Sequence, residues 1–344
     1  MIRPGIRGRI ALCLIGSLFD GRAVGTTQPQ QTMKKQLAVL TAATLLVLGA
    51  SSVDAATGEV FKSGTTWTGR VDGSTKYTGS SMNAAIQACI NAMSSGTVNI
   101  KNSGNADASY GVAPKNGVWL NYNGVTVNGN RATSVVQVDN KSNIRIDNLK
   151  MSGSPRYGVW VRTSSTITLG GCSHSGGGLP FRIDDSKGGW SRNVNANSPT
   201  SIGATAHGFE TYGVDGFYYG TVTARDSSGC GLLLNKTVNS SGGTVNAYNC
   251  NYGGGYAGFR CANSNGKGSL GTANSDRCGR GIFSVTQSRD MTVNNCLLQN
   301  CSGIGIWLQD TYNTRINAGT VRNNGGGCKS ITGGSGNVIN VACQ

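Results

Sequence analysis

The sequence has 344 residues, with 53 glycines, only 13% charged residues and a formal net charge of +15. Length alone allows one or two domains. Leucine-rich helical runs are nearly absent beyond the N-terminal region, so the composition disfavours a helical protein and predicts many short strands joined by tight turns.

The N-terminal region contains an export signal. The run MKKQLAVLTAATLLVLGASSVDAA begins at Met33, which two lysines follow, and continues as an apolar stretch. Near its end, Val53-Asp54-Ala55 fits a small-residue cleavage site. The alternative, a membrane anchor, is weaker because the apolar run is too short to span a bilayer comfortably. The expected division is an upstream extension (1–32), a signal peptide (33–55) and a secreted mature domain (56–344).

The mature chain is expected to be strongly basic. Without the first 55 residues, which carry six Lys or Arg and two Asp residues, the net charge falls from +15 to +11. A secreted protein with this charge is expected to bind a polyanion. In that compartment an acidic polysaccharide is a better candidate than nucleic acid or a membrane, and we expect a monomer. The alternative is that the charge serves only solubility.

Cysteine usage agrees with export. Ten of the eleven cysteines follow the expected cleavage site, and the sequence has no Cys-x-x-Cys pair of the metal-binding type. An even number of cysteines in an oxidising compartment allows disulfide bonds. Cys278 and Cys301 occupy similar turn positions in adjacent repeats, so they either form a disulfide or only stack.

One helix is expected early in the mature chain. In SSMNAAIQACINAM, beginning at Ser80, either Ser80 or Ser81 is suited to cap the N-terminus. We expect the helix to cover the N-terminal end of the strands that follow, where an unpaired edge would promote aggregation. The apolar residues fall on one face: Met82, Ala85, Ile86, Cys89, Ile90 and Met93.

The second half of the chain repeats. Units open at Gly158, Pro180, Gly208, Gly231, Gly258, Gly281 and Gly305, which are separated by 22, 28, 23, 27, 23 and 24 residues. Each unit then carries a second alternating run, such as GTVTARD or GTVNAYN. Helical repeats of this length would need amphipathic stretches of about ten residues, which these units lack. Short alternating strands and Gly/Asn turns instead predict a solenoid of parallel strands.

In repeat length, N-terminal helix and export signal, residues 57–344 resemble the right-handed parallel β-helix proteins of the pectate-lyase-like superfamily. The resemblance implies an all-β fold, a single-stranded right-handed parallel β-helix (solenoid) with an N-terminal capping helix. It also implies a secreted polysaccharide lyase or a related glycosidase.

Equivalent residues of successive coils are expected to stack at about 4.8 Å, with side chains alternating between the core and the outside. We number positions in each unit from its opening Gly or Pro, taken as zero. Positions one and three are mostly apolar and should point inward. The inward set is Val159, Phe181, Phe209, Leu232, Phe259, Ile282 and Ile306 at position one, and Val161, Ile183, Thr211, Leu234, Cys261, Ser284 and Leu308 at position three.

Positions two and four should therefore point outward, onto one shared wall. Position two holds Trp160, Arg182, Glu210, Leu233, Arg260, Phe283 and Trp307; position four holds Arg162, Asp184, Tyr212, Asn235, Ala262, Val285 and Gln309. Asp185 and Lys236 follow one step later, and His207 precedes its strand.

Two interpretations of this wall are open. Aromatic residues at the ends of a charged track suit a sugar-binding groove, with rings for sugar faces and ions for carboxylates. Alternatively, the charges form surface ion pairs of about 0–1 kcal/mol, His207 only holds a neighbouring carbonyl, and the outward apolar residues pack under a terminal tail or a long loop. The groove hypothesis assigns substrate contacts to Trp160, Arg162, Tyr212, Asn235 and Trp307.

A uronate polymer can be cleaved by β-elimination, which needs a base and neutralisation of the substrate carboxylate. Lysine becomes a base in a desolvated or cationic setting. The expected catalytic residues are Lys236 as the base, Arg182 and Arg260 as carboxylate clamps, and His207. Oxygen ligands for a hard cation such as Ca²⁺ are expected from Asp184, Asp185 and Glu210.

Local features resemble two enzyme groups of this superfamily. LNKT, with Lys236, and GFRCAN, with Arg260 one coil later, are similar to the base and arginine of alginate and chondroitin lyases; the acidic metal-ligand strand and the Leu-Arg-His run of those enzymes are absent. RIDDS and AHGFE are similar to polygalacturonase segments, but the third aspartate and Arg-Ile-Lys are missing. A glycoside hydrolase using Asp184 or Asp185 with Glu210, or a non-catalytic carbohydrate-binding β-helix, is therefore the alternative.

Overall fold

The structure is a computed structural model that describes residues 55–130 and 134–344. The chain divides into two units, Met1–Asp54 and Ala55–Gln344. The predicted upstream extension and, except for Ala55, the predicted signal peptide lie outside the described residues. Within the described ranges, no helix has the length and apolar character needed to cross a membrane.

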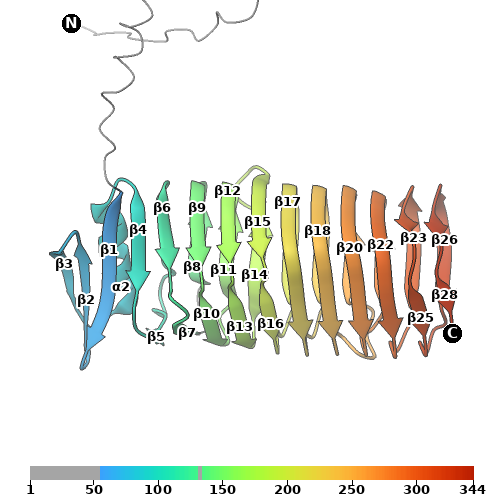
Figure 1. Ribbon diagram of the computed structural model, residues 1–344, viewed down its shortest axis with the longest axis horizontal. Coiled ribbons are helices and arrows are strands. Elements are labelled where there is room, and N and C mark those ends of the chain that lie inside the picture. Colours follow the sequence, from blue (N-terminus) through green and yellow to red (C-terminus); the bar gives the residue numbers. More distant parts are fainter. Residues whose placement is uncertain (1–54, 131–133) are drawn as a thin grey trace, which may run out of the picture. The chain divides into compact units, whose positions relative to one another are not determined.

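The second unit is a parallel β-helix, as predicted (Figure 1). The first strands form an antiparallel meander of β1 (Ala56–Ser63), β2 (Thr66–Val71) and β3 (Ser74–Gly79). Every other strand pairing in the described residues is parallel and joins a strand to its counterpart in the next coil. The backbone groups of each coil are therefore satisfied by the coils before and after it.

The strands fall into three rows along the stack, and β17 and β18 are long enough to serve all three. Row one contains β8 (Ser134–Asp139), β11 (Tyr157–Arg162), β14 (Leu179–Asp184), β17 (Phe209–Arg225), β18 (Leu232–Tyr248), β19 (Phe259–Ala262), β21 (Ile282–Val285), β23 (Ile306–Tyr312) and β26 (Lys329–Ser335). Row two contains β1, β4 (Gly96–Ile100), β6 (Val118–Asn121), β9 (Ser142–Asp147), β12 (Ser165–Gly170), β15 (Ser191–Asn197), β20 (Gly266–Asp276), β22 (Arg289–Gln299), β24 (Arg315–Ile316) and β27 (Val338–Ile339). Row three contains β5 (Gly104–Asn105), β7 (Thr126–Gly129), β10 (Lys150–Gly153), β13 (Ser173–Gly176), β16 (Thr200–Ile202), β25 (Thr320–Arg322) and β28 (Ala342–Cys343), with the later parts of β20 and β22.

The core lies inside the coils and is built from the two predicted inward columns. All fourteen of their residues are at most 2% exposed. Aromatic rings pack through the centre, with Phe209 at 5.3 Å from Phe181 and 5.4 Å from Phe217 between ring centroids. The alternation in the sequence thus predicted the core correctly.

The predicted helix is α2 (Met82–Ala92), and Ser81 is its N-cap, accepting a hydrogen bond from the Ala84 backbone N–H at 3.1 Å. Its apolar face is buried against β1, β2, β3 and β4. Figure 1 places it beside β1 at the N-terminal end of the stack. The helix therefore covers this end with apolar side chains, as the sequence predicted.

Row one ends at a recurrent bend. The residue five positions after the opening Gly has a positive φ in most coils, a conformation unfavourable for L-residues other than glycine. Lys236 at +47° and Gly213 at +67° are the examples next to the charged wall; the others are Thr163, Asn263, Thr286 and Asp310. Lys236 therefore lies at the bend within β18 at which row one ends.

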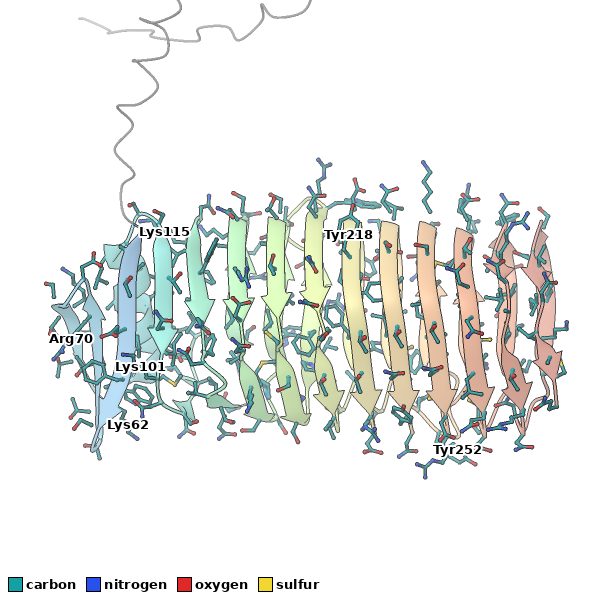
Figure 2. All side chains as sticks on the ribbon, viewed as in Figure 1. Lys62, Arg70, Lys101, Lys115, Tyr218 and Tyr252 are labelled. Carbon is teal, nitrogen blue, oxygen red and sulfur yellow. A yellow bond between two sulfur atoms is a disulfide. The ribbon has the colours of Figure 1, made fainter. Side chains whose placement is uncertain are left out.

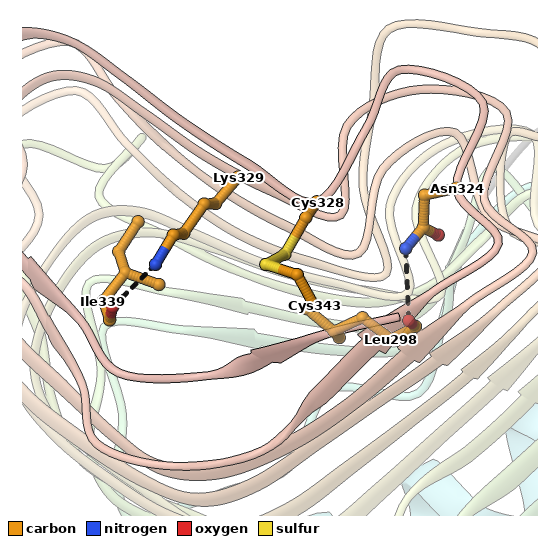
Figure 3. The surroundings of a disulfide bond; sticks show 6 residues. All are labelled: Leu298, Asn324, Cys328, Lys329, Ile339 and Cys343. Atoms are coloured by element: carbon orange, nitrogen blue, oxygen red, sulfur yellow. Dashed lines mark hydrogen bonds between the residues drawn. A yellow bond between two sulfur atoms is a disulfide. The ribbon is translucent and has the colours of Figure 1, made fainter.

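The C-terminal coil is closed by a disulfide between Cys328 and Cys343 (Figure 3). The remaining cysteines in the described residues are free and buried. Cys250, Cys278 and Cys301 form one small cluster with two alanines. Cys278 and Cys301 therefore stack and do not form a disulfide, which settles the alternative left open by the sequence.

Candidate functional site

The strand register brings the predicted position-two residues into one line. Trp160 pairs with Arg182, which pairs with Glu210. The line continues through Leu233, Arg260, Phe283 and Trp307. Position four runs beside it, with Asp184, Tyr212 and Asn235 in register. We call this surface the charged wall: Trp160, Arg182, Asp184, Asp185, His207, Glu210, Tyr212, Lys236 and Arg260.

Arg182 lies at the centre of the charged wall and holds two acids. Its Nε is 3.0 Å from Asp184 Oδ2, and its Nη1 forms an ion pair with Glu210. Burial disfavours the cation, but Glu210 and Asp184 outweigh that cost and raise the pKa of Arg182. Arg182 is therefore a permanent cation whose charge is already compensated.

Asp184 is a buried carboxylate with a full set of donors. Trp160 Nε1 donates to Oδ2 at 2.9 Å, and the Ser186 hydroxyl donates to Oδ1 at 2.6 Å. Burial alone would raise the pKa of Asp184, but the hydrogen bonds from Ser186, Trp160 and Arg182 lower it. Asp184 is therefore ionised, and it fixes the orientation of the Trp160 indole.

Lys236 reaches across two coils to Asp185. Its Nζ is 3.0 Å from Asp185 Oδ2, and its side chain is 40% exposed. The same ammonium lies 5.7 Å from the Tyr212 ring and 5.5 Å from the Trp190 ring. The Arg182 guanidinium lies 5.7 Å from the Tyr212 ring as well. Tyr212 is thus in contact range of two cations.

Gly213 makes the Lys236–Asp185 pair possible. A Cβ at this position would lie 2.8 Å from the Asp185 Cβ and 2.6 Å from its Cγ, closer than real contacts allow. The positive φ of Gly213 adds strain for any other residue. The glycine at the bend therefore leaves room for the Asp185 carboxylate.

His207 is held as a neutral ring. The Cys230 backbone N–H donates to Nδ1 at 2.8 Å, and the Tyr256 ring meets the imidazole edge-on at 5.1 Å. Burial lowers the pKa of His207. Glu210 acts in the opposite direction and raises it, but the nearby cations of Arg260 and Arg182 lower it further. Because Nδ1 accepts, the proton is assigned to Nε2, which makes His207 a hydrogen-bond donor at neutral pH. It does not simply hold a carbonyl.

Arg260 has no acidic partner in the described part of the chain. Its guanidinium lies 5.1 Å from the Tyr256 ring and 5.0 Å from the Phe283 ring. Its buried Nε has no hydrogen-bond partner. Arg260 differs in this from Arg182 and from Arg162, whose Nε bonds Asp139 at 2.6 Å.

The other predicted substrate-contact residues are placed as follows. The Arg162 guanidinium lies 3.9 Å from the Trp160 ring, and Asn235 accepts a hydrogen bond from Asn263 at 2.8 Å. Trp307 stacks on Phe283 at 4.9 Å and donates from Nε1 to Thr332 at 2.8 Å. All of them lie on row one, and Arg162, Asn235 and Trp307 already have polar partners.

Four residues at the predicted outward positions two and four are buried, although the sequence predicted that they point outward. Leu233, Ala262, Phe283 and Val285 are buried in a second apolar cluster outside the coils, with Trp307 packed against it. Cys230 and Ala257, from the turns before two row-one strands, belong to the same cluster, and the guanidinium groups of Arg260 and Arg280 lie over Phe283.

Two hollows border the N-terminal side of the wall and share Arg156 and Tyr157. One, of about 510 Å³, includes Trp160; the other, of about 590 Å³, extends to Ala206, the chain neighbour of His207. Tyr157 and Trp160 pack at 4.3 Å between ring centroids. The hollows therefore provide a recessed surface that carries the Tyr157 and Trp160 rings and reaches Ala206.

The three predicted metal ligands do not gather into a cation site. Within residues 55–130 and 134–344, no group of three or more His, Cys, Asp or Glu side chains is placed to hold a metal ion. Asp184 and Glu210 share Arg182, and Asp185 holds Lys236. Each acid would have to exchange a cationic partner for Ca²⁺, so calcium stays a prediction and no step below depends on it.

The sequence missed several contributors. Arg280 stands directly before Gly281, just as His207 stands directly before Gly208. The alignment of repeats therefore already placed Arg280 at a position equivalent to that of His207. Trp190 and Tyr256 lie in turns outside the aligned strands, where strand alternation gives no direction for a side chain.

No protein-family model matches the sequence, and no curated protein matches it. Among solved structures, it is similar to a double mutant of the periplasmic alginate epimerase AlgG (TM-score 0.51, 12% identity, 71% of this chain and 75% of that one). It is also similar to the A-module of the Azotobacter vinelandii mannuronan C-5 epimerase AlgE4 (0.47, 15%, 76% and 92%) and to ORF18 of Geobacillus virus E2 (0.49, 12%, 76% and 58%). At 12% identity the similarity to the AlgG structure shows the right-handed parallel β-helix fold alone.

Proposed function

We propose that this right-handed β-helix protein is a secreted polysaccharide lyase that cleaves a uronate-containing polysaccharide by β-elimination. The observation that supports it most is the register, which places Arg182, Glu210 and Arg260 in one line. Lys236, neutral His207 and several aromatic rings lie on the same wall. An acidic polymer is the ligand that suits this combination of cations and rings.

Arg260 is the proposed carboxylate clamp. Arg182, the other arginine considered from the sequence, already holds Asp184 and Glu210. Arg260 has unused donors and a buried Nε without a partner, so a substrate carboxylate would satisfy it. His207 lies close enough to Arg260 for the cation to lower its pKa. Its Nε2–H is the proposed second donor to that carboxylate, where negative charge develops.

Lys236 is the proposed base. After its ammonium has released one proton to solvent, the amine takes the proton from the carbon next to the carboxylate. The electron pair forms a carbon–carbon double bond as the neighbouring glycosidic C–O bond breaks. The leaving oxygen takes a proton from solvent. The ammonium formed on Lys236 is then held by Asp185, in the arrangement observed at 3.0 Å. Proton transfer of this kind contributes about 10²–10⁴-fold to a rate.

Hydrolysis is the second candidate, because Arg182 brings the Asp184 and Glu210 carboxylates to one guanidinium. A hydrolase needs one carboxyl group that is protonated. The lowered pKa of Asp184 makes it unsuited to that role. The paired carboxylates thus favour hydrolysis geometrically, whereas the lowered pKa of Asp184 favours elimination.

The deciding experiment incubates the secreted protein with polygalacturonate and with alginate, with Ca²⁺ or with a chelator. The proposal predicts an absorbance rise from unsaturated products. Reducing ends without that absorbance indicate a hydrolase, and binding without either product indicates a carbohydrate-binding module; both contradict the proposal. Loss of activity in chelator would support the predicted calcium. Deuterium uptake from D₂O without chain cleavage would instead indicate epimerisation, which begins with the same proton removal.

A further inference from the structure

Two arginines without acidic partners meet at the C-terminal side of the wall. Arg260 and Arg280 lie with their guanidinium carbons 5.0 Å and 4.7 Å from the centroid of one ring, that of Phe283. Arg280 also lies 4.7 Å from the Trp307 ring, which stacks on Phe283. Two cations are therefore gathered on one stacked aromatic pair.

Nothing in the described residues compensates these two charges. Neither arginine belongs to any of the ion pairs there. Each guanidinium has five N–H donors, and the pair makes one hydrogen bond in the described structure, from Arg280 Nη1 to the Gly255 carbonyl. Burial and the neighbouring Arg260 together lower the pKa of Arg280, which reflects the cost of placing both cations here.

We propose that Arg280, beside Arg260, forms an anion subsite, which binds an acidic group of the polysaccharide, a carboxylate or a sulfate ester, on a different sugar unit from the one that Arg260 clamps. The partly exposed ring of Trp307, which stacks on the buried Phe283, would take the face of the sugar that carries it. The inference rests on the proposed function in that the ligand is an acidic polysaccharide. It adds Arg280 as a binding residue, and it requires that the bound polysaccharide carry a second anionic sugar unit.

The subsite lies away from the proposed reaction centre. Arg280 immediately precedes β21 as His207 precedes β17, three coils earlier in the stack, which corresponds to about 14 Å along the stack. An anion bound at Arg280 therefore belongs to a different sugar unit from the one whose carboxylate meets His207. The subsite thus selects oligosaccharides with several acidic units over single sugars.

A purely structural role would need a compensating acid or an exposed site. Arg162 and Arg182 each have acidic partners. Arg225 lies 4.3 Å from the Tyr248 ring without an acid, but it is exposed to solvent. Arg225 is therefore the matched control: an arginine on an aromatic ring, away from the charged wall and without a second cation.

The test measures binding by calorimetry in a Lys236→Ala background, which keeps the oligosaccharide intact. The probes are an oligogalacturonate, a sulfated galactan oligosaccharide and a neutral galactan oligosaccharide of equal length. Arg280→Gln should lower the affinity for the tighter-binding anionic probe about ten- to hundredfold. It should also reduce the dependence of that affinity on salt. Arg280→Lys should lose less. Arg225→Gln should change binding less than about twofold.

Which anionic probe depends on Arg280 identifies the acidic group. The proposal is overturned if Arg280→Gln and Arg225→Gln bind alike, if the neutral probe weakens equally, or if neither anionic probe binds. Far-ultraviolet circular dichroism and melting of each variant confirm folding, and Arg280→Lys provides the comparison if Arg280→Gln fails to fold. A protein without lyase activity can still bind the anionic probe through Arg280. Failure of the subsite proposal can therefore be distinguished from failure of the proposed reaction.

Discussion

His174 and His207, the two histidines of the chain, both have lowered pKa values but face different surroundings. His207 has Cys230 on one nitrogen and the charged wall nearby. His174 is 2% exposed in the core, and neither of its ring nitrogens has a hydrogen-bond partner. Its ring approaches the backbone of Gly153 and Gly177 without reaching hydrogen-bond geometry. His207 is thus suited to a site, whereas His174 makes folding sensitive to acid.

The stability of the protein should therefore depend on pH through His174. Burial lowers the pKa of His174 from 6.5 to about 4. The unfolded chain binds this proton first as the pH falls, so the contribution is complete above pH 6.5 and is lost progressively toward pH 4, by about 3 kcal/mol. Urea unfolding between pH 4 and 7.5 measures it.

His174→Met is the matched variant, because Met151 occupies the same column one coil earlier. It should remove most of the slope and leave the smaller part due to His207. An unchanged slope in His174→Met would show that other groups cause the acid sensitivity.

The two proposed catalytic residues make a second residue-scale prediction. Lys236→Ala should reduce turnover at least about 10²-fold through loss of the base, and Arg260→Ala should reduce it about 10²–10³-fold through loss of charge stabilisation. Initial rates of unsaturated-product formation measure both. Lys187→Ala, an exposed lysine after β14, is the control and should retain activity. Near-normal rates in both variants would reject these assignments.

At the scale of elements, strand alternation predicted most of the fold and of the outward wall correctly. The inward columns and the shared wall follow from the repeat length and the period of two. The helix follows from its apolar face and from the two serines before it, of which the structure selects Ser81. The pairing of Lys236 with Asp185, 51 residues away, does not. It depends on the bend at Lys236 and on the space at Gly213, and turn geometry of this kind leaves little trace in the order of residue types.

The aromatic core makes the element-scale prediction. Phe209 is 1% exposed and packs between Phe181 and Phe217. Phe209→Ala should lower the free energy of unfolding by about 3–5 kcal/mol, since it leaves a cavity between coils. Tyr218→Ala, also on β17 but 46% exposed (Figure 2), should cost less than about 0.5 kcal/mol. Equal losses in thermal or urea unfolding would contradict this account of the core.

At the scale of the whole molecule, positive charge extends beyond the wall. Lys62, Arg70, Lys101 and Lys115 lie on the N-terminal elements (Figure 2). Such charges attract a polyanion over about a Debye length, roughly 10 Å at 0.1 M salt, without specifying where it binds. Specific recognition therefore depends on the wall, while the remaining charge favours encounter.

The two ends of the stack are stabilised differently, by α2 at one end and by the Cys328–Cys343 disulfide at the other. The disulfide spans 15 residues, for which chain entropy predicts about 3 kcal/mol of stabilisation. In a repeat protein that loss should appear first in the terminal coils. Hydrogen exchange at β28 should accelerate in a Cys328→Ser/Cys343→Ser double variant, with little change at β17.

Treatment of the unmodified protein with a reducing agent should reproduce that pattern, and the same treatment should not change the double variant further. Uniform acceleration along all coils would contradict local fraying.

The line from Trp160 to Trp307 contains seven coil positions, about 29 Å at the strand spacing. A linear polymer lying along it has its own repeat, which need not equal that of the protein. Because the two spacings differ, a sugar unit and a coil are aligned at only a few places along the wall. The spacing of those coincidences would set the length of the fragments released and would let the polymer advance without leaving the surface.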